Sequence, residues 1–175
     1  MVQHKAPHRN WMPAMRHLDL YDDVEIPEPP TLFDKWEDNA PAARLQELEI
    51  DRHMDLNYDL FLDLTAEFNQ PPSQLRQDRS AWHNMKRMSP EQLAKWRSHY
   101  GPKDKAFHEA KLTGKDLVRW KFQRYAKNYL RCVKGVDESL ANLQKTLKNL
   151  GLDKTTIVIY SSDQGFYVGD HGWYD

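Results

Sequence analysis

The chain has 175 residues, of which 39% are hydrophobic and 29% are charged, and its formal net charge is −1. This length corresponds to one ordinary domain. The mean hydropathy of −0.87 is low for a compact α/β core. A single cysteine, Cys132, excludes an internal disulfide. No apolar run is long enough to span a bilayer, and no signal segment follows Met1.

The first 70 residues are predicted to contain one strand end, two loops and one helix. Residues 2–6 read as the end of a strand, and the prolines of residues 7–13 indicate an extended loop. The acidic, proline-rich residues 22–30 predict a second loop. Leucine and aromatic spacing favours a helix over residues 41–64, and Pro71-Pro72 would end it.

Two further helices are predicted in the second half of the chain. Ser89 before Pro90 is a typical helix start, and Gly101-Pro102 is predicted to end that helix. The strongest periodic pattern runs from residue 115 to residue 150 and predicts one long amphipathic helix. Its apolar positions follow one another in steps of three or four: Phe122, Tyr125, Tyr129, Val133, Val136, Leu140, Leu143, Leu147 and Leu150.

A β-branched run at residues 155–160 predicts a buried strand directly after this helix. Helix, short connector and core strand form an α/β unit in which the helix covers a sheet. A parallel sheet needs several buried strands, however, and clear strand signals occur only near the two ends of the chain. We therefore predict an α/β fold with few core strands and a long helix packing on the sheet, as part of a larger domain.

Polar ligands follow the predicted strand at the place where open α/β sheets bind ligands. Asp163 and Gln164 offer a carboxylate and a carboxamide, which are the oxygen ligands that hard divalent cations prefer. Adjacent residues of a strand point to opposite faces, so both can reach one ion only if the chain turns at Gln164. Gly165 makes such a turn easy.

Both ends of the chain resemble motifs of the type I, formylglycine-dependent sulfatases. Residues 156–175 contain a strand followed by Ser-Asp-Gln-Gly and a Gly-Asp-His-Gly loop, and residues 3–13 read Gln-His-Lys-Ala-Pro-His-Arg-Asn-Trp-Met-Pro. The resemblance implies an alkaline-phosphatase-like fold. It also implies that residues 1–175 are a single incomplete domain, the C-terminal half of a catalytic domain truncated at both ends.

The resemblance assigns roles to residues of both motifs. Asp163 and Gln164 would complete a calcium site whose acidic partners lie elsewhere, and His8 would help to protonate the leaving alcohol oxygen. We accordingly expect His8 and Asp163 to converge on one cleft. Lys5 and His171 are candidate substrate-binding residues, although His171 could instead brace its glycine-rich loop.

The expected nucleophile is missing from the chain. In the resembling family it is a Cys or Ser in Cys/Ser-x-Pro-x-Arg, whereas Cys132 lies in Arg-Cys-Val-Lys-Gly on the long predicted helix. An active-site lysine would follow Asp175. We therefore expect the chain alone to be inactive. The resemblance implies that the whole enzyme hydrolyses carbohydrate sulfate esters, such as glycosaminoglycan or mucin glycans, in the periplasm or outside the cell.

Two alternatives remain open on sequence grounds. One is a metal-dependent phosphodiesterase or phosphatase of the same superfamily, although such sites favour several Asp and His ligands. The other is a polyanion-binding module, because residues 103–134 hold ten Lys or Arg and three acids. The aromatic residues of this stretch fall on the apolar helical stripe and are expected in the core, so we do not expect nucleic acid as a partner.

Overall fold

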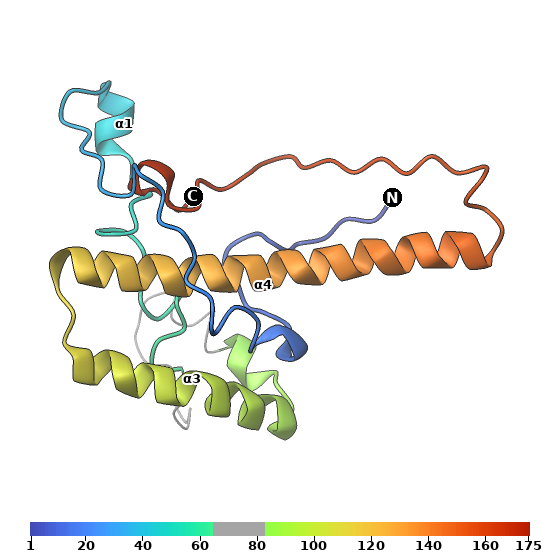
Figure 1. Cartoon of the computed structure of the whole chain (residues 1–175), viewed down its shortest axis with the longest axis horizontal. Helices are drawn as coiled ribbons and strands as arrows, with labels where there is room; N and C mark the ends of the chain where they lie inside the picture. Colours follow the sequence, from blue (N-terminus) through green and yellow to red (C-terminus); the bar gives the residue numbers. More distant parts are fainter. Residues whose placement is uncertain (65–82) are drawn as a thin grey trace.

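The structure is a computed structural model, and it describes residues 1–64 and 83–175. Its long helices α3 and α4 run in roughly opposite directions, one below the other in Figure 1. Loops and two extended terminal segments surround them. Pro71-Pro72, the predicted end of the first helix, lies outside the described residues. The elements are η1 (Met15–His17), α1 (Pro41–Leu45), α3 (Pro90–Ala110), α4 (Gly114–Asn149) and η2 (Asp170–Gly172).

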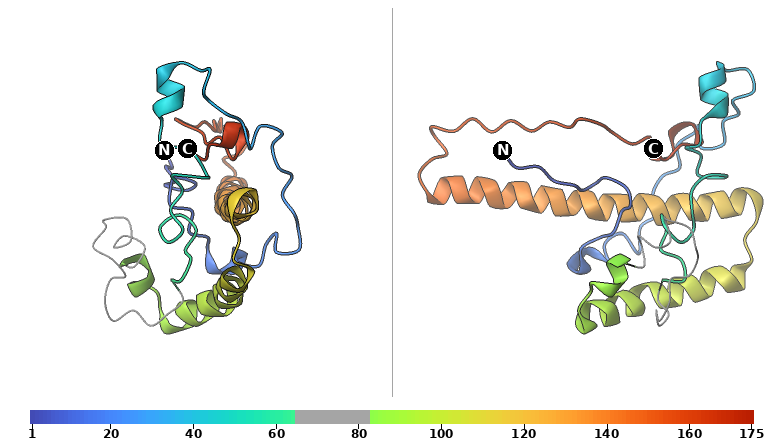
Figure 2. Two further views of the ribbon diagram at one scale, coloured as in Figure 1. Left: turned by 90° about the vertical axis from the view of Figure 1, so that its left-hand side faces the viewer. Right: turned by 180° about the vertical axis from the view of Figure 1, so that it is seen from behind.

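Helix α4 confirms the long helix predicted from periodicity, with its ends one residue from the expected ones. The N-terminal part of its apolar stripe is buried, as Phe122, Tyr125 and Val136 show. The stripe becomes exposed toward the C-terminal end, where Leu150 is 66% exposed. This end of α4 extends beyond the packed loops and lies beside the extended C-terminal segment (Figures 1 and 2).

Helix α3 begins as predicted but ends later. Ser89 and Gln92 form a complete capping box, with Pro90 in the first turn. The predicted end at Gly101-Pro102 is wrong, because the helix continues to Ala110. Pro102 removes one helical hydrogen bond and its ring crowds the preceding turn, but it does not end the helix here. The second half of α3 is held to α4 by a buried ion pair between Asp104 and Arg124, with N and O 2.9 Å apart.

The helix predicted for residues 41–64 is also wrong beyond its first turn. Only Pro41–Leu45 is helical, and the following residues form turns. The Asp55 carboxylate accepts hydrogen bonds from the backbone N–H groups of Asn57 and Tyr58. The Asp59 carboxylate accepts one from the N–H of Asp55. Such local side-chain bonds compete with helical hydrogen bonds and stabilise turns.

Neither predicted strand forms a sheet in the part of the chain that the structure describes. There, the one β-bridge joins Glu49 and Trp173. Thr155 ends a turn, and residues 156–160 are extended but unpaired, with Ile157 and Ile159 88% and 85% exposed. A strand needs a neighbour to take up its backbone hydrogen bonds. The few-strand sheet is therefore not observed, and residues 1–64 and 83–175 are mainly helix and loop.

The described residues form two buried apolar clusters. The first centres on Trp11 and the buried face of α4, and the second on Trp96 and Tyr100 of α3. Cys132 belongs to the first cluster, and burial raises the pKa of its thiol to about 12. This agrees with a packing role for Cys132. None of the described helices is long and apolar enough to cross a membrane.

The buried ion pair of Asp104 and Arg124 generates a stability prediction. Both side chains are at most 7% exposed. Asp104→Asn leaves the guanidinium buried beside a neutral group, so we expect the free energy of unfolding of the full-length protein to fall by about 3 kcal/mol. Urea unfolding measures this change. Glu109→Gln, which removes an exposed pair with Lys105 on the same helix, is the control and should have an effect of at most about 0.5 kcal/mol. Equal losses for the two variants would contradict the prediction.

Candidate functional site

The N-terminal motif presents His8 at the surface with one ring nitrogen engaged. Its Nδ1 lies 2.6 Å from the carbonyl oxygen of Arg9. A carbonyl oxygen can only accept, so Nδ1 carries the proton of this bond and Nε2 is left for another partner. The backbone N–H of His8 donates to the carbonyl of Lys5 and closes a turn. The Lys5 side chain is exposed and makes no hydrogen bond or ion pair with the described residues.

Trp11 joins this motif to the C-terminal loop. Its ring is fully buried and lies 4.4 Å from Tyr125 of α4, measured between centroids. Phe166 and Tyr174 pack on the same indole at 5.4 Å and 6.2 Å. The Tyr125 hydroxyl donates to the carbonyl of Tyr174 at 2.7 Å. The two motifs, more than 140 residues apart in sequence, therefore meet on one side of α4.

Asp163 and Gln164 lie three and two residues before Phe166, in an exposed bend. The Ser162 hydroxyl bonds the backbone of Gln164, while the Asp163 carboxylate and the Gln164 carboxamide make no hydrogen bond or ion pair within the described chain. Their oxygen atoms suit a hard divalent cation. No such contact links Asp163 directly with His8, so the predicted convergence of these two side chains remains a prediction.

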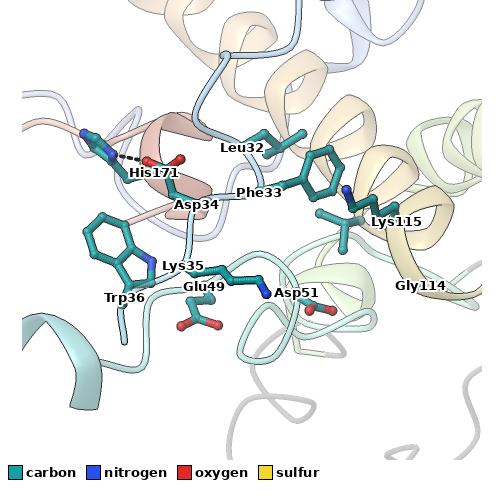
Figure 3. Close-up of a pocket in the computed structure, with 12 residues that line it drawn as sticks. Leu32, Phe33, Asp34, Lys35, Trp36, Glu49, Asp51, Gly114, Lys115 and His171 are labelled. Carbon is teal, nitrogen blue, oxygen red and sulfur yellow. Dashed lines mark hydrogen bonds and ion pairs between the residues drawn. The ribbon is translucent and has the colours of Figure 1, made fainter. Parts of the chain in front are cut away.

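His171 is held by contacts with residues 31–34, a loop far from it in sequence. Its Nδ1 lies 2.8 Å from an Asp34 carboxylate oxygen, and its backbone N–H donates to the Thr31 hydroxyl. Figure 3 shows His171 and Trp36 on one side of a cavity of about 320 Å³ that Lys35 also lines. The contact with Asp34 favours the bracing role that the sequence left open for His171.

Gly169 allows the His171 loop to approach α4 closely. Its φ angle of +94° is one that residues with side chains rarely adopt. A Cβ atom at this position would lie 2.7 Å from the Phe122 ring of α4. The glycine spacing of the C-terminal motif therefore has a packing cause.

Among the described residues, another group of possible metal ligands joins the first loops to α3. Asp19, Asp22 and His99 bring ligand atoms within 4.8 Å of one another. The Asp22 carboxylate already accepts from Lys103 at 2.8 Å and from Arg131 at 2.7 Å. Because two cationic side chains already pair with this carboxylate, their charges oppose the binding of a metal cation. This group is therefore an ion-pair network.

Sequence reasoning missed a buried contact behind His8. Arg9 forms an ion pair with Asp59, a residue fifty positions away that is fully buried. Arg9 stood inside the recognised motif, but Asp59 belongs to a stretch expected to be helical. Asp59 is a charged residue outside the apolar pattern of that stretch, so nothing in the sequence indicated that its partner lies near the N-terminus.

The chain resembles sulfatases in sequence and in structure. Residues 29–174 match the protein family described as Sulfatase. An N-acetylglucosamine-6-O-sulfatase of Bacteroides thetaiotaomicron is 40% identical over 176 residues, which cover 100% of this chain and 30% of that protein. The solved structure of BT4656 in complex with its substrate D-glucosamine-2-N,6-O-disulfate matches with a TM-score of 0.84 at 39% identity, covering 98% of this chain and 34% of the other. The chain thus spans about a third of the length of these relatives.

The ion-pair network around His99 predicts a dependence of stability on pH. Burial, with a smaller contribution from Lys103, lowers the pKa of His99 from 6.5 to about 4. Between these values the unfolded chain binds more protons than the folded one, so stability falls as the pH decreases from about 6.5 to about 4. Urea midpoints of the full-length protein across this range should fall more steeply than those of His99→Gln. Parallel curves would show that His99 does not titrate in this way.

Proposed function

Because this chain belongs to the sulfatase family, we propose that it forms part of an enzyme that hydrolyses sulfate esters of carbohydrates. The observation that carries this proposal is the meeting of the two terminal motifs at Trp11, with His8 exposed on one motif and free oxygen ligands on the other. The proposal concerns the full-length protein, since this chain spans about a third of its relatives.

His8 is proposed as the general acid of the reaction. When its Nδ1–H bonds the carbonyl of Arg9, the imidazolium form has an Nε2–H directed away from this bond. The proton passes from Nε2 to the alcohol oxygen as its bond to sulfur breaks, which avoids release of an alkoxide. Histidine is the side chain that most often acts as a general acid in enzymes.

Asp163 and Gln164 are proposed to hold a calcium ion together with ligands from elsewhere in the full-length protein. Their donors are oxygens, as calcium prefers. When bound, the cation would balance negative charge on the sulfate oxygens. The exposed Lys5 ammonium is proposed to bind a sulfate oxygen. His171 is proposed to act through its contact with Asp34, by holding the loop that approaches the site.

The nucleophile is proposed to be a formylglycine located elsewhere in the full-length protein. Cys132 is unsuited to this role, because it is buried on α4 and its thiol pKa is raised to about 12. A thiol that stays protonated at neutral pH is a poor nucleophile.

The relatives support sulfated glucosamine as the substrate class. One is named for a 6-O-sulfate of N-acetylglucosamine, and the other was solved with D-glucosamine-2-N,6-O-disulfate. A polyanion-binding role for residues 103–134 has less support, since Phe122 and Tyr125 are buried and Arg124 and Arg131 pair with carboxylates. We retain periplasmic or secreted localisation as a proposal from the family resemblance.

The acid role of His8 is tested by varying the leaving group. His8→Ala in the full-length protein should lower kcat on a 6-O-sulfated glucosamine by about 100-fold or more. An aryl sulfate, whose phenolate leaves without protonation, should lose much less. The control is His4→Ala, which removes an exposed histidine bonded to Ser139 and should leave both rates unchanged. Equal losses of His8→Ala on the two substrates would argue against a proton-donating role.

The metal assignment predicts an order of effects. Asp163→Ala should remove most of the activity and Gln164→Ala less, because only the first change removes charge along with a ligand. Turnover of metal-free full-length enzyme titrated with calcium, magnesium and zinc identifies the cation. Restoration by zinc and not by calcium would favour the phosphatase-like alternative over the sulfatase mechanism.

A further inference from the structure

We infer that Arg9 and Asp59 are positioning residues for His8. The inference rests on the proposed function, since it concerns the residue proposed as the general acid. Neither residue needs to touch the substrate. They would act by fixing the backbone carbonyl that orients the His8 ring.

The ion pair of Arg9 and Asp59 has a geometry that fixes the guanidinium. Nε and Nη2 of Arg9 donate to the two carboxylate oxygens of Asp59 at 2.6 Å and 2.8 Å. Two parallel bonds define both the position and the plane of the guanidinium. Burial lowers the pKa of Arg9, but the Asp59 carboxylate raises it by more, so the net pKa lies above its usual value. Arg9 is therefore charged at every pH of interest.

Aromatic rings enclose the same guanidinium. Its central carbon lies 5.1 Å from the ring centroid of Tyr58 and 5.0 Å from that of Tyr174. Rings at this distance attract a cation through their electron-rich faces. Tyr174 belongs to the C-terminal motif, so Arg9 contacts both the turn at residues 55–59 and the loop that ends the chain.

Asp59 is fixed in turn by the protein around it. The residue is 0% exposed, and its Oδ2 also accepts from the backbone N–H of Asp55 at 2.8 Å. Beside it, the Asn10 carboxamide donates to the carbonyl of Tyr58 at 3.1 Å. Arg9 and Asn10 thus attach the N-terminal motif to one turn at two successive positions.

The contacts connect this anchor to the ring of His8. The Arg9 carbonyl that accepts from His8 Nδ1 at 2.6 Å belongs to the residue whose side chain Asp59 holds. If the Arg9 side chain is released, the adjoining peptide can rotate, and the direction of Nε2 is no longer defined. A displacement of about 1 Å at a catalytic group can lower a rate by about 100-fold.

The test compares Asp59→Asn with Asp104→Asn in the full-length protein. Both changes remove one carboxylate oxygen from a buried Arg pair, but the pair of Asp104 lies between α3 and α4 and does not touch the His8 motif. We expect both variants to lose stability. Only Asp59→Asn should lower kcat on the 6-O-sulfated glucosamine, by about 10- to 100-fold, with KM and the rate on an aryl sulfate little changed.

Two further variants make the result specific. In a His8→Ala background, Asp59→Asn should cause no additional loss on the sugar sulfate, because the group that it positions is already absent. Arg9→Lys retains the charge but lacks the two-pronged geometry, and should show the same substrate-dependent loss to a smaller degree. This variant also serves as the test if Asp59→Asn does not fold.

The outcomes separate the inference from the proposed function. If Asp59→Asn and Arg9→Lys lower both substrate rates equally, as a purely structural pair would, or lower neither, the inference is wrong while the role of His8 stands. If His8→Ala itself leaves turnover of the sugar sulfate intact, the proposed function fails first.

Discussion

The arrangement of this chain depends on buried cations of α4 that donate hydrogen bonds to loop carbonyls. Lys121, Arg124 and Arg131 are each at most 7% exposed. Loops without a sheet need donors for their buried carbonyls, because an unsatisfied polar group costs free energy. Long basic side chains on a rigid helix supply them. The acceptors are Ile50, Asp51 and Met54 for Lys121, Leu60 for Arg124, and Leu20 for Arg131.

This use of charge explains why α4 holds loops from very different parts of the chain. Arg124 binds a loop carbonyl and Asp104 of α3, while Arg131 binds a loop carbonyl and Asp22. Arg124 thereby connects α4 to two separate segments, and Arg131 connects it at two points to the loop at residues 20–22. Three of the ten basic residues in the stretch read as a possible polyanion surface therefore belong to the internal framework of the fold. Of the ten, Lys103, Arg119 and Arg131 pair with Asp22 or Glu28 in the acidic first third of the chain.

The sequence predicted the features that depend on local pattern. The periodic run was sufficient to place α4, and the capping residues were sufficient to place the start of α3. The helix predicted for residues 41–64 was wrong because the spacing of apolar residues says nothing about Asp55 and Asp59. The carboxylates of these two residues accept hydrogen bonds from nearby backbone N–H groups. Residues 155–160 have strand composition, and residues 156–160 are extended. A ladder is a property of two segments, however, and no described segment pairs with residues 156–160.

Site residues could be predicted only where a motif named them. His8 came from the family resemblance, whereas Asp163 and Gln164 were also indicated by their place after a predicted strand. The packing of Trp11 with Phe166 supports bringing the two segments together. Arg9 and Asp59 could not be paired from one sequence, because fifty residues separate them and each charge has many possible partners. The structure of BT4656 matches 98% of this chain, which supports the backbone path that brings such distant residues together.

The two halves of the proposed site differ in how far this chain organises them. His8 has its ring held by Arg9, and Arg9 is held by Asp59 and two aromatic rings. The side chains of Asp163 and Gln164 have no such support among the described residues. These contacts can therefore position the proton donor without further parts of the protein. A cation site with two ligands, in contrast, needs more oxygen atoms to reach the coordination number that calcium prefers. Changes behind His8 should consequently act on proton transfer, and changes at Asp163 on metal binding, so the two effects are separable in one enzyme.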